Sequence, residues 1–254
     1  MLEVRHLNKT YRSGFFGKRK AEAVRDVSFR IEDGEIFGLI GESGSGKTTI
    51  TRMIAGLLKP TSGSIIYEGR DLVRANGRAW HGLRREIQVV FQHPQMTFHP
   101  RKDIYFACAE PIRLYHLDRH KSEKEMIGHM MGRVGIPEDQ WHKYPHEISG
   151  GQAHRIAIAR ALALNPKLLI CDEPTSMLDV SVQAQILRLL LRANEKYHVA
   201  MLFISHDLEV IQAVCQRVAV MYEGEIVEMG TVDEVFNHPK HTYTKKLLAA
   251  HMPV

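Results

Sequence analysis

The sequence predicts an α/β protein built on a parallel β-sheet, with an antiparallel β region and a separate helical region. From Lys167 onward, apolar segments of strand length alternate with longer segments of helical periodicity, which is the pattern of a parallel sheet. The first third instead contains short strands separated by turn residues such as Asp33-Gly34. Residues 92–160 combine aromatic, His and Met residues with helical periodicity, which indicates a helical insertion.

Each part of the chain has its own expected elements. LEVRHL, VSFRI and GSIIYEG are expected strands, and the buried strand EIFGLI leads through glycines into the helix KTTITRMIAGLL. The helix SEKEMIGHMMGRV begins with Ser122 and Glu125, which have the spacing of a capping box. The strands KLLICDE and VAMLFISHD then flank the helix VQAQILRLLLRANEKY, and a last hairpin is expected to turn at Glu223-Gly224.

Composition places the chain among ordinary globular proteins. Its 254 residues, 44% hydrophobic and 25% charged, are enough for one large domain or two modest ones. The longest apolar segments, such as VAMLFI, have the length of a strand and are far short of a membrane span. The start of the chain lacks a basic and then apolar leader, so we expect no secretion and a membrane role only through a partner.

The cysteines and the net charge indicate a reducing compartment and a solvated surface. Cys108, Cys171 and Cys215 are widely spaced, without the spacing of a disulfide framework or a metal site, which favours a cytoplasmic setting. The net charge is +5, and the cations are scattered apart from short clusters such as Arg84-Arg85. We therefore expect no nucleic-acid partner.

Fifteen histidines raise the question of a metal, and nickel in particular. His116 and His120 are spaced i,i+4, but a metal site needs convergent ligands, and Pro145 interrupts the segment between His142 and His146. Most of the histidines are therefore expected at the surface.

The segment GESGSGKT, residues 41–48, fits the phosphate-loop pattern G-x-x-x-x-G-K-[ST]. A strand precedes it and a helix follows it, and this context makes the pattern specific. Its glycines let backbone N–H groups point at phosphates, Lys47 reaches the β- and γ-phosphate oxygens, Thr48 holds Mg²⁺, and Thr49 adds a hydroxyl near the α-phosphate. The expected nucleotide-binding residues of the loop are Gly41, Ser43, Gly44, Gly46, Lys47, Thr48 and Thr49.

A pair of carboxylates follows a second apolar strand, in LLICDE. Asp172 ends this strand, where open α/β sheets bind their ligands, and can bind Mg²⁺ through water. Glu173 is a candidate to polarise the attacking water. A solvated pair at a strand end is the alternative, and the neighbouring phosphate loop favours the functional interpretation.

The segment ISGGQ, residues 148–152, allows two interpretations. Ser149 and Gln152 have the spacing of a capping box, S-x-x-Q. Yet each glycine in the first turn of a helix costs up to about 1 kcal/mol relative to alanine, and a cap alone needs neither Gly150 nor Gly151. Backbone N–H groups at a helix start bind anions, so close approach of a ligand is the second interpretation.

These three segments, ISGGQ, GESGSGKTT and LLICDEPTSMLD, resemble those of the ATP-binding subunits of ABC transporters, with Ile148 where the family has leucine. The resemblance covers nearly the whole chain. It implies an α/β fold with a P-loop NTPase (RecA-like) core, formed by residues 1–91 and 161–235 and including an antiparallel β subdomain. Residues 92–160 would form an α-helical subdomain, and residues 236–254 a C-terminal tail.

The resemblance also implies a role for further residues. Two subunits would pack head to tail, so that Ser149, Gly150, Gly151 and Gln152 of one close on the γ-phosphate held by the other. Tyr11 would stack on adenine, although a strand-end aromatic is its alternative, and Asp179 would cross the interface. Gln92 would sense Mg²⁺ and γ-phosphate, and His206 would contact γ-phosphate. The catalytic candidates are thus Glu173, His206 and Gln92, and the metal candidates are Thr48, Gln92 and Asp172.

Two more segments, FQHPQMTFHPRK and NHPKHTYTKKLLAA, resemble the dipeptide, oligopeptide and nickel importer branch, whose patterns are FQDP…LNPR and HPxHPYTxxLL. The chain departs from them at His93, at Phe98-His99 and at Thr242. Tyr243/Leu247 and Thr244/Leu248 are spaced i,i+4, so a docked terminal helix is an alternative explanation of the tail. The tail has no cysteine, so no iron–sulfur site is expected.

The expected function is therefore ATP hydrolysis that powers import of a peptide, nickel or a related small solute, with ATP and Mg²⁺ as cofactors. The implied partners are a second ATP-binding subunit, two transmembrane permease subunits and an extracytoplasmic substrate-binding protein. The chain itself would lie at the cytoplasmic face of the cell membrane, bound to the permease subunits.

A soluble ABC-type ATPase acting on ribosomes or DNA is the alternative function. A single set of motifs without a heptad insertion disfavours it. A P-loop kinase or GTPase-like switch would leave ISGGQ unexplained.

Overall fold

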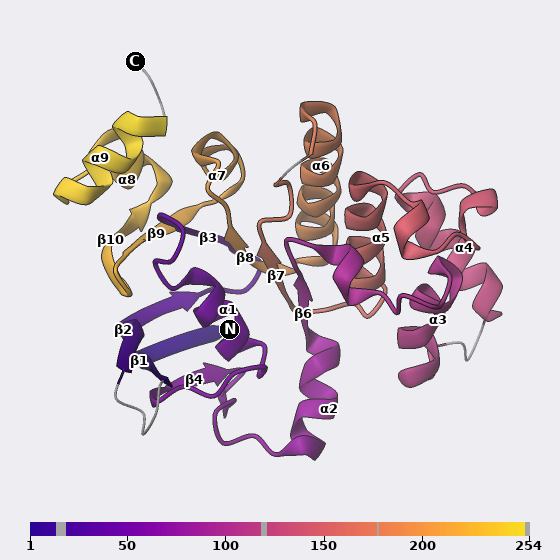
Figure 1. The fold of residues 1–254 in the computed structure, drawn as a ribbon, viewed down its shortest axis with the longest axis horizontal. Helices are drawn as coiled ribbons and strands as arrows, with labels where there is room; N and C mark the ends of the chain where they lie inside the picture. Colours follow the sequence, from indigo (N-terminus) through magenta and orange to yellow (C-terminus); the bar gives the residue numbers. More distant parts are fainter. Residues whose placement is uncertain (14–18, 118–120, 177, 252–254) are drawn as a thin grey trace.

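The computed structural model describes residues 1–13, 19–117, 121–176 and 178–251. A six-stranded sheet runs through the centre of the molecule in the order β10-β9-β3-β8-β7-β6 (Figure 1). Five of its strands are mutually parallel, and β10 pairs with β9 in the antiparallel sense. These strands are β3 (Ile36–Ile40), β6 (Ile87–Val90), β7 (Leu168–Asp172), β8 (Ala200–Ile204), β9 (Arg217–Tyr222) and β10 (Glu225–Thr231).

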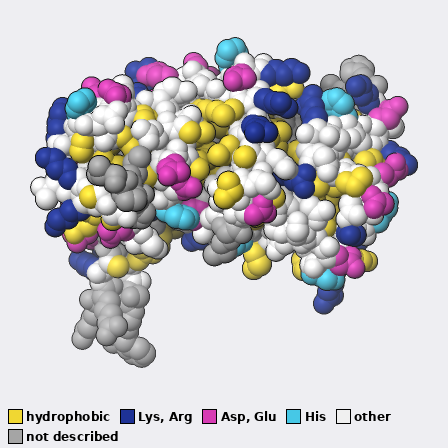
Figure 2. Space-filling model, turned by 90° about the horizontal axis from the view of Figure 1, so that it is seen from above, with side chains coloured by type: hydrophobic (Ala, Val, Ile, Leu, Met, Phe, Trp, Pro, Cys, Tyr) yellow, Lys and Arg dark blue, Asp and Glu magenta, His cyan; other side chains and the backbone are white. Residues whose placement is uncertain are grey.

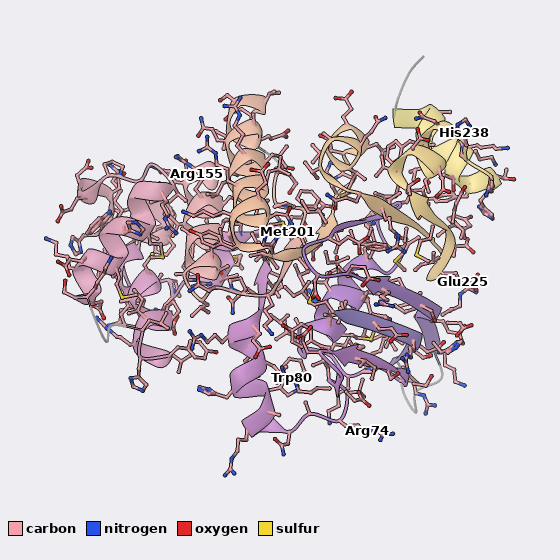
Figure 3. The ribbon with its side chains drawn as sticks, turned by 180° about the vertical axis from the view of Figure 1, so that it is seen from behind. Arg74, Trp80, Arg155, Met201, Glu225 and His238 are labelled. Carbon is pink, nitrogen blue, oxygen red and sulfur yellow. The ribbon has the colours of Figure 1, made fainter. Side chains whose placement is uncertain are left out.

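The central sheet is covered on both faces, which explains why its strands are continuously apolar. Every residue of β3, β7 and β8 is buried. Alternate side chains enter two different cores: Met201, labelled in Figure 3, and Phe203 lie in one, and Leu202 lies in the other. The sequence stretch VAMLFI is therefore a strand buried between two layers.

One face of the central sheet packs against helices that connect its later strands or follow the last of them. They contribute Ile158, Ile186 and Ile211 to a common core with the terminal helices. These helices are α5 (Gly150–Leu162), α6 (Val180–Tyr197), α7 (Leu208–Val214), α8 (Val232–Asn237) and α9 (Thr242–His251). Leu247 and Leu248 of α9 are both buried there, so the tail does form a docked helix.

The other face packs against α1 (Lys47–Ile54), α2 (Gly77–Glu86) and a four-stranded antiparallel sheet in the order β2-β1-β4-β5. Tyr67 and Leu2 of that sheet are fully buried in this second core. The antiparallel strands are β1 (Leu2–Ser13), β2 (Arg19–Ile31), β4 (Ser62–Tyr67) and β5 (Arg70–Asp71). The expected antiparallel β region is thus present.

The helical region between β6 and β7 has a third core of its own, at the right of Figure 1. Ile127 and Met131 of α4 and Cys108 of α3 are buried in it. Besides α5, the region contains α3 (Ile104–Leu114), α4 (Glu123–Arg133) and the 3₁₀ turns Pro94–Thr97, Glu138–Gln140 and Pro145–Glu147. The capping box of Ser122 and Glu125 is confirmed at the start of α4.

The structure differs from the sequence expectations near the first helix. The apolar pattern extends to Leu58, but α1 ends at Ile54, because Gly56 follows with φ +68° and Leu57 turns out to be 60% exposed. The helix α2, which carries Trp80 (Figure 3), was not expected in the β-rich first third. Its sequence has few apolar residues, and only Leu83 is buried.

The turn at Glu223-Gly224 is confirmed, since both residues have positive φ.

No helix within the described residues has the length and hydropathy needed to cross a membrane. On the face drawn in Figure 2, cationic and acidic side chains of the described residues are intermixed, and hydrophobic side chains gather near its centre.

Candidate nucleotide-binding site

The phosphate loop leaves the end of β3 and is shaped by two glycines whose neighbours are backbone atoms. A Cβ on Gly41 would lie 2.1 Å from the carbonyl oxygen of Met221, and a Cβ on Gly46 would lie 2.3 Å from that of Ala23. Both have positive φ, so neither position tolerates a side chain. Gly44, with φ +84°, has no described atom within 4 Å of its would-be Cβ, and Ser43 beside it is exposed. This is the side of the loop that a ligand can approach.

Lys47 is folded back into its own loop. Its Nζ donates to the carbonyl oxygens of Gly41 at 2.7 Å and Glu42 at 2.8 Å, and to Ser45 Oγ at 3.3 Å. The side chain is 7% exposed. Burial lowers the pKa of Lys47, and the carboxylates of Glu173 and Asp172 raise it in opposition. The ammonium is thus bound by two backbone carbonyls and one hydroxyl, and phosphate oxygens are acceptors of the kind that can replace the carbonyls.

Asp172 lies beside the helix that follows this loop. It is 5% exposed, and its pKa is raised first by that burial and then by the adjacent charge of Glu173. A hydrogen bond with the Thr48 side chain acts in the opposite direction, as does Lys47. The charged form of Asp172 is thus disfavoured by burial and by the charge of Glu173, so a cation bound there would stabilise it. The Asp172 carboxylate and the Thr48 hydroxyl are oxygen ligands of the kind that Mg²⁺ prefers.

Gln92 and His206 both approach one carboxylate oxygen of Glu173, and all three residues follow neighbouring strands. Gln92 Nε2 donates to Glu173 Oε2 at 2.8 Å, and His206 Nδ1 lies 3.3 Å from the same atom. The residues follow β6, β7 and β8, which are adjacent in the sheet, so their carboxyl ends share one edge. Glu173 has φ +51°, an uncommon conformation for a non-glycine residue. The structure therefore brings together all three catalytic candidates.

The segment ISGGQ forms its capping box and begins α5. Ser149 N donates to Gln152 Oε1 at 2.9 Å, and Gln152 N donates to Ser149 Oγ at 3.2 Å. A Cβ on Gly151 would lie 2.7 Å from Val182 Cγ1, whereas a Cβ on Gly150 would make an ordinary contact, 3.7 Å from Leu178 Cδ2. Close packing of α5 against α6 is thus a reason for glycine at position 151 that does not depend on a ligand, whereas exposed Gly150 has no such packing reason.

The phosphate loop and ISGGQ do not meet within the chain. Figures 1 and 3 place α1 and α5 on opposite sides of the β6 strand. No hydrogen bond or ion pair between described residues joins residues 149–152 to residues 41–49. The two segments are therefore separate sites within one chain.

Tyr11 and Asp179 lie apart from the cluster around Glu173. Tyr11 is 40% exposed on β1, with the Lys9 ammonium 5.3 Å from its ring centroid. Asp179 is the exposed N-cap of α6 and accepts from Val182 N at 3.0 Å and from Ser181 Oγ at 2.7 Å. The Ser181 hydrogen bond is the main reason that the pKa of Asp179 is lowered. Their described contacts are compatible with ordinary structural roles.

Two contacts near the site were not anticipated from the sequence. Tyr243 of α9, interpreted from its spacing only as part of a docked helix, accepts a hydrogen bond at its hydroxyl from Glu42 N of the phosphate loop, at 3.1 Å. His154 is 4% exposed, unlike most of the histidines, and its Nδ1 lies 3.1 Å from Gly150 O. The motif HPxHPYT marks Tyr243 in the sequence but gives no partner for it.

Comparison with known proteins now identifies the family. Residues 24–176 match the protein family described as "ABC transporter". The chain is 43% identical over 257 residues to the oligopeptide transport ATP-binding protein OppF of Haemophilus influenzae, covering 98% of this chain and 77% of the relative. It is 45% identical over 230 residues to OppF of Salmonella typhimurium, covering 90% and 69%. The glutathione import ATP-binding protein GsiA of Pectobacterium atrosepticum is 43% identical over 241 residues, which span 94% of this chain and 39% of that protein.

Solved structures show the same architecture. The dimeric, post-hydrolysis ATP-binding cassette MJ0796 with ADP and Pi is similar with a TM-score of 0.83 and 27% identity, covering 91% of this chain and 99% of that one. CbiO1 of Clostridium perfringens, part of the ABC transporter complex CbiONQ, has a TM-score of 0.77 and 27% identity, covering 99% and 95%.

The chain therefore belongs to the ABC transporter family, as an ATP-hydrolysing subunit whose fold is the α/β P-loop NTPase core expected from the sequence. Its relatives confirm the importer branch with OppF and GsiA, and the ribosome- or DNA-acting alternative is set aside.

The close contact at Gly151 generates a first prediction. Gly151→Ala should lower the free energy of unfolding by about 1–3 kcal/mol, because the added methyl overlaps Val182. Adding Val182→Ala should recover part of this loss. Gly150→Ala is the matched control and should unfold at nearly the wild-type urea concentration. Equal losses for both glycines would contradict the packing explanation.

Proposed function

We propose that residues 41–49 bind ATP with Mg²⁺ and that Glu173 drives its hydrolysis, with Gln92 and His206 as the other catalytic residues. The observation that carries the proposal is the convergence of Gln92 and His206 on one oxygen of Glu173. Lys47 would exchange its carbonyl partners for β- and γ-phosphate oxygens. Glu173 Oε2 would then accept the proton of a water that Gln92 Nε2 orients. His206, 63% exposed at its side chain, can turn toward the γ-phosphate.

The metal would be held by Thr48 and Asp172, with Gln92 as a third ligand. When bound, Mg²⁺ supplies positive charge that neutralises phosphate oxygens. The contact of Asp172 with Thr48 and its burial beside Glu173 support this assignment.

A second ATP-binding subunit, identical or related, would complete each site. Its residues Ser149, Gly150, Gly151 and Gln152 would approach the γ-phosphate, with exposed Ser149 and Gly150 nearest to it. Asp179 would lie at the subunit interface, and Tyr11 would stack on adenine. The exposure of both segments, and their separation within one chain, support this arrangement. The dimeric state of the similar cassette MJ0796 supports it further.

The substrate proposed is a peptide, carried through two permease subunits at the cytoplasmic face of the membrane and delivered by an extracytoplasmic binding protein. The names of OppF and GsiA support a peptide or glutathione. Nickel is the second candidate from the branch. His116 is exposed, His120 lies outside the described residues, and the described residues contain no group of three His, Cys, Asp or Glu that could hold a metal ion.

We propose three parts of the chain. Residues 1–91 and 161–235 form the nucleotide-binding core, residues 92–160 the helical subdomain, and residues 236–254 the C-terminal tail. The separate hydrophobic core of the helical region supports it. Within the segment TSMLD, Met177 lies outside the described residues.

The catalytic assignment predicts that Glu173→Gln leaves ATP binding near the wild-type level and slows hydrolysis at least about 100-fold, because an amide cannot accept the proton. Phosphate release and ATP binding should be measured on the same preparations. Glu209→Gln, an exposed change on α7, is the control and should hydrolyse normally. Wild-type turnover by Glu173→Gln would remove Glu173 as the base.

The two-chain site predicts a recovery on mixing inactive variants. Lys47→Ala should lose ATP binding, and Gly150→Asp should bind ATP but not hydrolyse it, because the new carboxylate meets the γ-phosphate of the partner site. A mixed dimer has one site with both changes and one site with none. ATPase activity should therefore return to a fraction of wild type. Folded variants that associate yet stay inactive would exclude the shared site.

The substrate assignment is tested by uptake into proteoliposomes that contain this chain with its permease subunits and binding protein. We expect ATP-dependent accumulation of a labelled oligopeptide and none of nickel. The same preparation with Glu173→Gln is the control for leak. Accumulation of nickel without peptide would reverse the assignment.

A further inference from the structure

The C-terminal helix reaches the phosphate loop through one tyrosine. The hydroxyl of Tyr243 accepts a hydrogen bond from Glu42 N at 3.1 Å, and its side chain is largely buried. Tyr243 belongs to the tail segment HPKHTYTKKLL, which neither ATP binding nor hydrolysis has explained so far. The contact joins parts of the chain that are 201 residues apart.

The bonded N–H belongs to the peptide group between Gly41 and Glu42. The carbonyl of that same group, Gly41 O, accepts from Lys47 Nζ at 2.7 Å. A peptide group is planar, so fixing the direction of its N–H also fixes the direction of its C=O. Tyr243 and Lys47 therefore hold opposite ends of one rigid group at the start of the loop.

Tyr243 itself is held firmly in place. Its ring packs on Tyr222 with the centroids 4.1 Å apart, and Leu247 and Leu248, further along the same helix, are buried in the core. The segment before α9 is attached to β10, since both carboxylate oxygens of Glu228 accept backbone N–H groups, from Lys240 at 2.7 Å and His241 at 3.0 Å. The hydroxyl is thus presented to the loop by an anchored helix.

Apolar burial alone does not explain this hydroxyl. The ring and the two leucines would bury the same apolar surface with a phenylalanine at position 243. Among the described residues, the hydrogen bond of the Tyr243 hydroxyl is made to Glu42 N. The polar atom therefore serves the loop rather than the core.

We propose that Tyr243 is a positioning residue for nucleotide binding: it fixes the Gly41–Glu42 peptide so that the loop is preorganised for phosphate. The tail then forms part of the nucleotide site as a support behind the loop, and does more than cover the core. This inference rests on the proposed binding of ATP by residues 41–49.

The test is Tyr243→Phe in the full chain, with binding of a fluorescent N-methylanthraniloyl ATP and steady-state ATPase activity as readouts. Loss of this one partly buried hydrogen bond predicts ATP binding weaker by about three- to tenfold, with KM raised by the same factor and kcat changed less than about twofold. Tyr222→Phe makes the same chemical change in the other ring of the stack and should bind ATP like wild type.

A second measurement addresses the loop directly. Hydrogen–deuterium exchange without nucleotide should become faster in the peptide that contains Glu42 in Tyr243→Phe, and should stay unchanged in α9 and in Tyr222→Phe. This readout separates loss of the loop contact from general loosening of the terminal helix.

The outcomes decide between the alternatives. Wild-type affinity and unchanged exchange in Tyr243→Phe would overturn the inference and leave α9 as a docked helix only. Equal weakening in Tyr222→Phe would also overturn it, because the loss would then not depend on the hydroxyl that accepts from Glu42 N. ATP binding that survives Lys47→Ala would instead overturn the proposed site itself, so the two failures are distinguishable.

Discussion

The buried ammonium of Lys47 is the interaction on which the site depends. A charge that is 7% exposed has to be compensated, since an unpaired buried ion costs several kcal/mol. Here two carbonyls and a hydroxyl accept its hydrogen bonds, and three carboxylates, those of Glu173, Asp172 and Glu42, lie near enough to raise its pKa. Those carbonyls can point inward only because the loop turns through glycines with positive φ, at positions where a Cβ would strike backbone atoms.

The parallel sheet supplies the rest of the geometry. Strands β3, β8, β7 and β6 are neighbours in that order, so the segments that follow them emerge at one edge. The loop of Lys47 follows the first of these strands, His206 the second, Glu173 the third and Gln92 the fourth. Gln92 and His206, more than a hundred positions apart, thus meet at one carboxylate, and three of the four strands, β3, β7 and β8, are buried along their whole length.

Gly151 illustrates how one residue can carry two requirements. The helix α5 approaches α6 so closely that a single methyl at this position would overlap Val182. Close packing favours glycine there, whatever it does for a ligand, and it lies next to exposed Gly150, which has no such close neighbour. A substitution at Gly151 therefore changes the packing of α5 on α6, whereas one at Gly150 leaves that packing intact.

The sequence by itself determined the fold class, the phosphate loop and the strand-end carboxylates, because these depend on local patterns: apolar runs of strand length, glycines at fixed offsets and a lysine before a helix. It also gave the capping boxes of α4 and α5, since each spans four residues. Only the tertiary structure decided that Gln92 and His206 share one oxygen of Glu173, that α1 ends at Ile54, that Gly151 packs on Val182, and that Tyr243 reaches Glu42. The reason is physical: local spacing follows from the chain's own geometry, whereas contacts between distant residues depend on how whole elements pack, and no short pattern encodes that.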